Sequence, residues 1–590
     1  MSFRVFLTAG FLAVSAFLRA AWFRVPVGGA DVTSIVVDPF ERGSVYCGTS
    51  RGNIYRSEDD GRAWEPTRPG NQFPGYVVST LAADVRTPGK LWAALSGTGL
   101  GALVAVSPDR GATWEVLARW DRAVDARAFA QSRSDPKVLA CGGDDGVFLS
   151  RDGGRTWAPS GTGVPGLVLV QTLAFDPADS STLYAGTYRQ PFRTRDLGKT
   201  WSRIAAGMVL DATVYSFDFD PRDARRLWVS TCGWVYLSED GGDRWTRYST
   251  GFTNRRTPVV HADPRHSNVL FAGTVGGLHR SDDGGRTWNR ISRETLDVSA
   301  LDIDPKTGRL FLGTFGEGIF TSDDEGATLA AANGLEEARV PAVAADPVDP
   351  ARVMFLRAYA GISSGVWEAD ASGARQTSAQ APPGAFTLAA ARLSGRTVWL
   401  CASASTLLVS TDGGRGFSPP AQGPSGRILG IFGAPLPVPV VVTDTGVYTS
   451  EDGMTFRRAA VAGSPSAARI VSDANSAPEL EVTTSAGIFR GTRVFEGSRK
   501  ALLSGGIFRS SRPASEPYFE FSVWQSTLTL RRGAQSTSLL LPRDALQVSG
   551  AQVAGNGNLY MSTMGDGLFV WSPDVAVPRS SGDVAASVGK

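Results

Sequence analysis

The first 330 residues repeat one short phrase seven times, and this repeat constrains the fold more than any other feature of the chain. The phrase reads Ser/Thr-x-Asp-x-Gly-x-Thr-Trp, and its copies begin at Ser57, Ser107, Ser150, Thr194, Ser238, Ser281 and Ser322. Successive copies are 50, 43, 44, 44, 43 and 41 residues apart. A period of about 40–45 residues with strand-like text between the copies is typical of β-propeller blades. The repeat therefore predicts an all-β chain built from such blades.

The text between two copies of the phrase reads as four strands. In residues 171–204, QTLAFDP alternates like an inner strand, LYAGT resembles a buried second strand, and PFRTRD and TWSRI resemble a third and a fourth. This order predicts one four-stranded antiparallel blade. An Asp-Pro pair ends the inner strand because proline has no N–H group for a β-ladder. The pair recurs at Asp38-Pro39, Asp176-Pro177, Asp220-Pro221, Asp263-Pro264 and Asp304-Pro305.

The chain of 590 residues is too long for one ordinary domain. We expect a signal peptide at 1–20, a first propeller of seven blades at 21–336, a second, degenerate propeller at 337–576, and a disordered tail at 577–590. In the second half the phrase persists only in degenerate copies, at 407–417 and 447–456, and the strand text allows six or seven blades. Two seven-bladed propellers in tandem are the favoured division. A single ten-bladed propeller with an added domain is the alternative.

The segment AWFRVPV at residues 21–27 resembles a fourth strand that has lost its phrase. We expect it to complete a blade whose other strands come from the opposite end of the chain. Such pairing hides a sheet edge that would otherwise present unpaired backbone groups.

The N-terminus has the composition of a secretory signal. Arg4 precedes an apolar run from Val5 to Leu18, and small residues follow, with Val14-Ser15-Ala16 and Leu18-Arg19-Ala20 as possible cleavage sites. The run is shorter than the stretch of about 20 residues that a transmembrane helix needs. The sequence therefore predicts a secreted or periplasmic protein that is not inserted in a membrane after signal removal.

Composition argues against several classes of function. The net charge is +2 with both signs interspersed, which gives no support for nucleic-acid binding. Cys47, Cys141, Cys232 and Cys401 each fall in or just after the second strand of a different blade, so we expect no disulfide framework. The three histidines, His261, His266 and His279, lack metal-ligand spacing. We therefore expect neither a metal nor a cofactor.

The aspartate of each phrase is expected to be structural. Its carboxylate can accept hydrogen bonds from turn N–H groups, the glycine supplies a positive φ, and the tryptophan packs between sheets. The aspartates concerned are Asp59, Asp109, Asp152, Asp196, Asp240, Asp283, Asp324, Asp412 and Asp452.

The opposite face of the first propeller is where we expect a ligand. Strand order places the Asp-Pro turns and the repeated phrase on one face, and the loops after the second strands on the other, near the central channel. Loop residues on that face are Ser50, Arg51, Asp144, Asp145, Tyr188, Arg189, Trp234, Phe315 and Glu317. The connections between blades add Trp120, Asp121, Asp125, Asp211, Arg255 and Arg256. Aromatic and charged side chains around a channel mouth suit a sugar or a peptide.

The phrase resembles the Asp-box, or BNR repeat, of sialidases, sortilin-type receptors, two-propeller xyloglucanases and photosystem II stability/assembly factors. In these families the box lies on the face away from the active site. The photosystem factors use one propeller to hold an assembly partner, and this chain is nearly twice as long. The resemblance implies a propeller fold and leaves the function open.

Two short motifs of the chain are similar to motifs of enzyme families. Sialidases carry Phe/Tyr-Arg-Ile-Pro, of which Phe23-Arg24-Val25-Pro26 matches three positions, but the strand text that follows lacks the required carboxylate. Xyloglucanases carry an acid in a first-blade motif that is similar to residues 46–56, where this chain has Ser50. A serine cannot act as general acid or base in glycoside hydrolysis, which needs two carboxyl groups.

The sequence therefore predicts a non-enzymatic tandem propeller that binds a protein or a glycan on the loop face of its first propeller. A polysaccharide hydrolase similar to the xyloglucanases is the alternative, and a sialidase ranks third.

Overall fold

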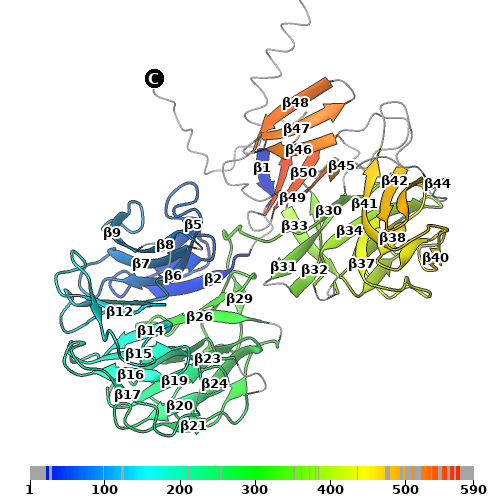
Figure 1. The fold of residues 1–590 in the computed structure, drawn as a ribbon. Helices are drawn as coiled ribbons and strands as arrows, with labels where there is room; N and C mark the ends of the chain where they lie inside the picture. The colour runs from blue at the N-terminus through cyan, green and yellow to red at the C-terminus, as the bar shows by residue number, and fades with distance from the viewer. Residues whose placement is uncertain are drawn as a thin grey trace, which may run out of the picture. The chain divides into compact units, whose positions relative to one another are not determined.

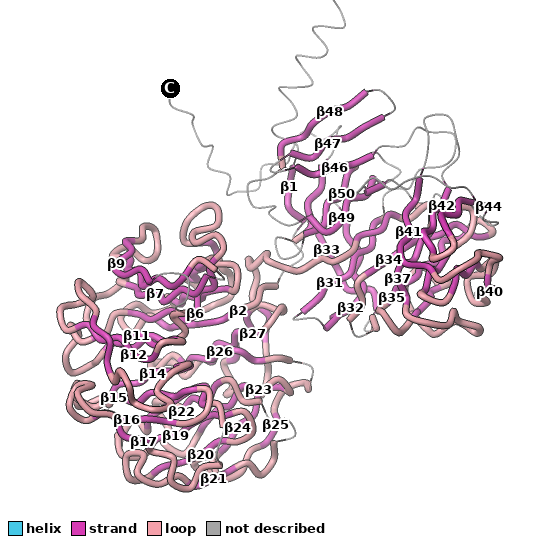
Figure 2. Tube along the Cα trace, in the orientation of Figure 1, coloured by secondary structure: helices cyan, strands magenta, loops and turns pink. Residues whose placement is uncertain are grey.

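A computed structural model of the chain describes residues 22–25, most of 29–471, 479–491 and short stretches up to 571. The described residues form strands, turns and loops without a helix, which confirms the predicted all-β class (Figure 2). The expected signal peptide at 1–20 and tail at 577–590 lie outside the described residues. Contacts divide the chain into two compact units, one of residues Gly28–Glu337 and one of Met1–Val27 with Ala338–Lys590.

The first unit contains seven four-stranded antiparallel sheets, each made from consecutive strands (Figure 1). We number these sheets blades 1 to 7 in chain order. Their strands are β2 Val32–Val37, β3 Val45–Thr49, β4 Ile54–Ser57, β5 Glu65–Pro66; β6 Tyr76–Ala83, β7 Leu91–Gly97, β8 Gly101–Ser107, β9 Glu115–Trp120; β10 Ala128–Gln131, β11 Leu139–Gly143, β12 Gly146–Ser150, β13 Ala158–Ser160; β14 Val170–Phe175, β15 Leu183–Thr187, β16 Pro191–Thr194, β17 Ser202–Arg203; β18 Val214–Phe219, β19 Leu227–Thr231, β20 Val235–Ser238, β21 Thr246–Tyr248; β22 Val259–Ala262, β23 Leu270–Thr274, β24 Gly277–Ser281, β25 Asn289–Arg290; and β26 Val298–Ile303, β27 Leu310–Thr314, β28 Ile319–Ser322, β29 Ala330–Ala331.

Neighbouring blades pack because a glycine of one second strand receives a valine from the next inner strand. A Cβ atom at Gly142 in β11 would lie 2.5 Å from Cγ1 of Val170 in β14, and one at Gly313 in β27 equally close to Cγ1 of Val32. These distances are far below a normal carbon contact, so any side chain there would push the blades apart. The same pairing joins Gly48 to Val78, Gly186 to Val214 and Gly273 to Val298. The recurring Gly-Thr text of the sequence has this packing as its cause.

The ring of seven blades is closed between blades 7 and 1. The Oγ of Ser299 in β26 donates a hydrogen bond to the carbonyl of Val32 in β2 at 2.6 Å. The backbone N–H of Val37 donates to Oδ2 of Asp302 at 2.8 Å. The inner strands of the first and last blades are therefore joined directly.

A segment at 333–337, which we call the strap, follows the last strand of blade 7 in the sequence and binds blade 1. The backbone N–H of Asn333 donates to the carbonyl of Arg62, and that of Glu337 to the carbonyl of Gly29. The buried Glu337 side chain accepts hydrogen bonds from Asn53 Nδ2 at 2.7 Å and Thr49 Oγ1 at 3.2 Å. Burial raises the pKa of Glu337, while these hydrogen bonds oppose the rise.

The repeated phrases, which we call Asp-boxes after the repeat they resemble, form similar turns at the ends of the third strands. In blade 3, Oδ1 of Asp152 accepts the Ser150 hydroxyl at 2.8 Å and the Thr156 N–H at 2.9 Å. The turn is tied to its own blade because Gly153 N–H donates to the carbonyl of Lys137, beside the inner turn. Boxes and inner turns therefore share one face, which we call the turn face, and the opposite face is the loop face. The same hydroxyl-to-carboxylate bond occurs at Asp59, Asp109, Asp196, Asp240, Asp283, Asp324, Asp412 and Asp452.

The second unit has six sheets among the described residues, where the sequence allows six or seven blades. One of them, β34–β36, has three strands. The strands are β30 Val343–Ala345, β31 Val353–Tyr359, β32 Ile362–Asp370, β33 Gly373–Ser378; β34 Thr387–Leu393, β35 Arg396–Ala402, β36 Leu407–Ser410; β37 Ile428–Phe432, β38 Val440–Thr443, β39 Gly446–Thr449, β40 Arg457–Arg458; β41 Pro465–Val471, β42 Glu479–Thr484, β43 Gly487–Gly491, β44 Glu496–Gly497; β45 Phe508–Arg509, β46 Glu520–Trp524, β47 Thr527–Arg532, β48 Gln535–Leu540; and β49 Val548–Val553, β50 Leu559–Thr563, β51 Leu568–Trp571 with β1 Trp22–Val25.

The last sheet of the second unit takes its fourth strand from the start of the chain. Strand β1 pairs antiparallel with β51, with Trp22 opposite Trp571 and Val25 opposite Leu568. Residues 22–25 of the predicted segment thus complete a blade built from the other end of the chain. Residues 22–25 therefore belong with the second unit, and the first propeller starts at Gly28 instead of residue 21.

We expect residues 28–337 to fold alone, because the ring closure and the strap both lie within them. A chain ending at residue 331 should melt at a lower temperature, since it lacks the strap and leaves Asn53 and Thr49 without Glu337. Circular dichroism melts of the two fragments test this. Equal melting temperatures would show that the strap does not hold the ring closed.

We expect Asp152→Ala to lower the melting temperature and Trp157→Ala to lower it further. The aspartate orders only its own turn, whereas the Trp157 ring lies 5.8 Å from that of Trp120 on the preceding blade. Losing this partly buried ring should cost about 3 kcal/mol.

The contribution of Asp152 to stability should depend on pH. Turn hydrogen bonds from Thr156 and Ser150 lower the pKa of Asp152 to about 2, so its contribution to the free energy of unfolding is full above pH ~4 and is lost as the pH falls towards 2. Melts at pH 7 and pH 2.5 would contradict this if the Asp152→Ala deficit were the same at both.

Candidate functional site

The inner strands of the first unit run from the loop face to the turn face, and most carry a bulge at the loop-face end. The register of pairing shifts between Val32 and Ser34, between Val214 and Ser216, and between Val298 and Ala300, with equivalent shifts in blades 2 and 4. A β-bulge adds an unpaired residue and re-aims its side chain. The backbone at the channel mouth therefore presents side chains that regular strands would bury.

Five blades contribute to one row of polar and aromatic residues at this mouth. Within it, the Arg256 guanidinium lies 5.9 Å from the ring of Tyr215, and Ser50 Oγ donates to Asp31 Oδ2 at 3.2 Å. Thr213 Oγ1 joins blades 4 and 5 by donating to the carbonyl of Tyr188 at 2.9 Å. We call this row the mouth arc, and its members are Tyr188, Tyr215, Arg256, Asp297, Asp31 and Ser50.

The repeat geometry explains why these residues meet. In five of the seven blades the loop residue after the second strand donates its N–H to the carbonyl of a residue just before the inner strand, as Ser50 does to Asp31 and Phe315 to Asp297. Arg256 accepts the equivalent bond from Val275. Arg256, Asp297 and Asp31 are thus the same position in blades 6, 7 and 1, which are consecutive around the ring.

The carboxyl of Asp297 has an environment unlike that of a surface acid. Burial raises its pKa, the nearby Arg256 opposes the rise, and the charge of Asp31 adds to it. Its Oδ1 is buried and has no hydrogen-bond partner among the residues that the structure describes. Buried carboxyl oxygens normally have such a partner, so this atom is a point where a ligand donor would be stabilised.

The structure separates the residues that the sequence singled out. Asp144 is held by Arg127, whose Nη2 lies 3.0 Å from both Asp144 Oδ1 and Asp125 Oδ2. Glu317 is paired with Arg293. Trp120 packs between blades, with its ring 5.1 Å from that of Phe148, instead of facing the channel.

The other residues predicted to lie on the loop face differ in how exposed they are. Trp234 is partly buried under Arg247, whose guanidinium lies 5.0 Å from its ring. Phe315 and Arg51 are partly buried, and Asp145 and Arg189 are exposed on the loops of blades 3 and 4. Asp121, Asp211 and Arg255 lie outside the described residues.

Sequence reasoning missed Asp31, Tyr215 and Asp297. A signal was present, because blades 1 and 7 share the text Asp-Val before the inner strand, at 31–32 and 297–298. Those aspartates lie directly before the inner strands, whereas the prediction rested on other loop-face positions.

Below the mouth arc, His261 is clamped between two carboxylates inside the channel. Its Nδ1 lies 2.7 Å from Asp218 Oδ2 and its Nε2 3.2 Å from Asp302 Oδ1, so the three side chains join blades 5, 6 and 7. Burial alone would lower the pKa of His261, but the two aspartates override it and raise the pKa to about 10. The imidazolium therefore stays charged in the folded protein at neutral pH.

We expect His261→Gln to destabilise the protein most below pH 6.5. The native pKa of about 10 exceeds the ordinary value of 6.5, so the contribution of His261 is full below pH 6.5 and is lost as the pH rises through 10. Urea unfolding of both proteins between pH 6 and 10 measures the difference. His266→Gln, which alters an exposed histidine of the same blade, is the control, and a difference that did not shrink with pH would contradict the clamp.

Blades 6 and 7 together hold three groups that could meet at a metal ion. The ligand atoms of Asp263, His266 and Glu325 lie within 4.8 Å of one another. Arg265 already pairs with Asp263 at 3.0 Å and with Glu325 at 3.8 Å. These carboxylates are thus engaged by a cation of the protein itself.

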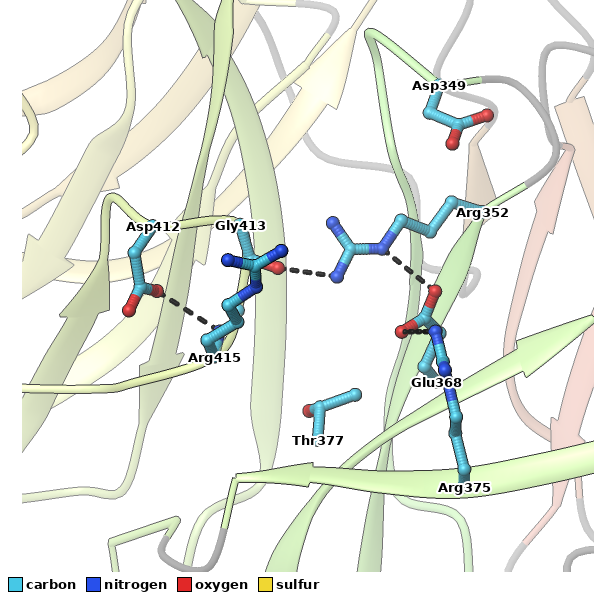
Figure 3. Close-up of a pocket in the computed structure, with 9 residues that line it drawn as sticks. Asp349, Arg352, Glu368, Arg375, Thr377, Asp412, Gly413 and Arg415 are labelled. Carbon is cyan, nitrogen blue, oxygen red and sulfur yellow. Dashed lines mark hydrogen bonds and ion pairs between the residues drawn. The ribbon is translucent and has the colours of Figure 1, made fainter.

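The second unit has a polar hollow of about 550 Å³ at the edge between its first two sheets (Figure 3). Arg352 crosses this gap, with Nε 3.1 Å from Glu368 Oε1 and Nη2 donating to the carbonyl of Gly413. Arg375 Nη2 lies 3.1 Å from the other Glu368 oxygen. The arrangement braces an Asp-box turn against the neighbouring sheet, and its charges are largely satisfied within the protein.

Comparison with known proteins identifies the fold class. No protein-family model and no curated protein sequence match the chain. Among solved structures, an ancestral GH74 enzyme superposes with a TM-score of 0.68 at 14% identity, covering 95% of this chain and 100% of its own. The GH74 xyloglucanase of Xanthomonas campestris gives 0.55 at 18% identity, covering 94% and 99%. PorZ, a surface component of the type-IX secretion system of Porphyromonas gingivalis, gives 0.53 at 11% identity, covering 94% and 87%.

These likenesses show that the chain is a tandem β-propeller. At such low identities they do not transfer an activity, because one fold supports many functions. In the part of the chain that the structure describes, no helix is long and apolar enough to cross a membrane.

Proposed function

We propose that this chain is a secreted or periplasmic glycan-binding protein whose ligand binds the mouth arc of the first unit. The observation that carries the proposal is the uninterrupted run of Tyr215, Arg256, Asp297 and Asp31 across four consecutive blades. The location rests on the signal-like N-terminus at 1–20.

The chemistry of the mouth arc suits a sugar. Tyrosine rings present an apolar face for the C–H surface of a sugar and a hydroxyl at the edge. A guanidinium beside carboxyl groups offers directed donors and acceptors for neighbouring hydroxyls. The unpartnered Oδ1 of Asp297 would accept one such hydroxyl. A protein ligand would favour a larger apolar patch, and the mouth arc consists mainly of polar groups.

We expect Arg256→Gln and Tyr215→Ala each to weaken glycan binding roughly ten- to hundredfold, because each removes a directed or stacking contact. A glycan array identifies a soluble oligosaccharide, and calorimetry on the purified variants measures its affinity. Glu115→Gln, an exposed acid on outer strand β9, is the control and should bind normally. Array binding that both mouth-arc variants retain would place the ligand elsewhere, and capture of proteins alone would favour a protein ligand.

Glycoside hydrolysis is the second candidate, and Asp297 favours it. Hydrolysis needs one carboxyl that keeps its proton and a second carboxylate across the bond. Asp297 has the raised pKa, and Asp31 lies one hydrogen bond from Ser50, the position at which xyloglucanase-like motifs carry an acid.

A reducing-sugar assay on xyloglucan and β-glucans separates the two candidates. Turnover that Asp297→Asn abolishes while binding persists would establish the hydrolase. Binding without turnover in the unaltered protein would reject it.

A further inference from the structure

The turn face of the first unit carries a second concave site at the other mouth of the channel. A hollow of about 570 Å³ opens there, and its floor is mostly apolar. We call it the pit; its apolar lining includes Pro39, Phe40, Val85, Pro264, Ile303 and Pro305. Phe40 is 41% exposed, so part of its surface is accessible to a ligand in the pit.

Basic side chains from five blades surround the pit. Each stands in the turn that follows an inner strand, so the repeat brings all five to one rim although they are spread over 220 residues of sequence. We call this set the basic ring, and its members are Arg86, Arg133, Arg222, Arg265 and Lys306. Arg86 and Arg133 also line the pit itself.

Four of the five charged ends are held in place around the rim. Arg222 Nη2 donates to the carbonyl of Arg265 on the next blade at 3.0 Å, and Arg265 Nη1 donates to that of Thr307 at 3.0 Å. Arg86 Nη2 reaches the carbonyl of Arg133, and Lys306 Nζ that of Phe40, each at 3.3 Å. One contact of this kind leaves most donors of a guanidinium available. Their positions are thus set before any ligand binds, which reduces the entropy cost of binding.

The carboxylates at this rim neutralise only one member of the ring, Arg265, which pairs with Asp263 and Glu325. The aspartates that begin the turns are buried, and their oxygens accept N–H groups of the same turns, as Asp220 does from Arg222. In the described part of the chain, Arg86, Arg133, Arg222 and Lys306 have no carboxylate partner. His261 and Asp302 also line the pit, where His261 engages both Asp302 and Asp218.

We propose that the turn face is a docking surface for a protein partner that lays a carboxylate-rich segment on the basic ring and inserts an apolar side chain into the pit. The ring demands several negative charges, spread over more than one blade. The pit demands an apolar group between them. An anionic polysaccharide would satisfy the charges and leave the proline- and phenylalanine-lined pit unfilled. This site lies on the face opposite the mouth arc and is independent of the proposed glycan function.

Two capped heptapeptides test the proposal on the full-length chain. One has phenylalanine between three glutamates on each side, and the other has glycine in its place. We expect the phenylalanine peptide to bind about tenfold more tightly, because it buries a ring in the pit. Binding of both should weaken steeply as salt rises, because the rim charges are exposed. Fluorescence anisotropy measures the affinities.

Variants separate the two parts of the site. Arg86→Gln with Arg133→Gln should weaken both peptides at least tenfold, whereas Phe40→Ser should remove the advantage of phenylalanine and leave the glycine peptide unchanged. Arg155→Gln with Arg244→Gln is the charge-matched control, because both arginines are exposed in Asp-box turns. Arg256→Gln at the mouth arc should leave peptide binding unchanged.

Several outcomes would overturn the proposal. Equal affinity for the two peptides would mean that the pit takes no part. An equal loss in the charge-matched control would reduce the effect to overall charge. Binding of a heparin fragment more tightly than either peptide would identify a polyanionic glycan as the ligand. Absence of binding by either peptide at low salt would reject the docking surface.

Discussion

The architecture depends on a contact between neighbouring blades in which one blade has a glycine and the other packs a valine against it. The second strand of five of the first seven blades carries glycine where the valine of the next inner strand arrives. An added methyl group at such a contact costs about 1–3 kcal/mol in a packed core, and the contact recurs around the ring. Because this contact recurs at five of the seven junctions between blades, it holds most neighbouring blades at a similar spacing. The positions of the inner strands, and of everything at their two ends, follow from that spacing.

Regular spacing converts sequence periodicity into two rims of different chemistry. Residues that start the inner strands gather at the loop face, where Arg256, Asp297 and Asp31 stand side by side. Residues that end them gather at the turn face, where the basic ring surrounds an apolar hollow. Between the rims, the charged His261 joins Asp218 and Asp302 across three blades. The ring of repeats in the first unit thus has one polar channel mouth, charged side chains inside the channel, and a basic mouth at the other end.

The fold could be predicted from the sequence because each blade is encoded by one short, continuous segment. Each blade lies within about 43 consecutive residues, and the Asp-box and Asp-Pro marks give strand order and face without knowledge of neighbours. The strand at 22–25, which completes a blade of the second unit, could also be predicted, since it is a strand without a box.

The candidate ligand-binding residues were harder to predict from the sequence. Asp144 and Glu317 looked suitable from their loops, but their arginine partners, Arg127 and Arg293, are known only from the structure. Asp31 and Asp297 are 266 residues apart in sequence, and the balanced net charge concealed five basic side chains that share a rim.

The pairing of β1 with β51 has a consequence for the order in which the chain folds. The ring of the first unit is complete in sequence once Glu337 has been made, so this unit can form while synthesis continues. Strand β1 precedes that ring, yet its partner is among the last segments to be produced. One of the earliest strands must therefore stay unpaired, past the folding of the unit that follows it, until the far end arrives. A newly made chain consequently has a period in which β1 is open to pairing with another molecule, and that period lengthens with every delay in synthesis.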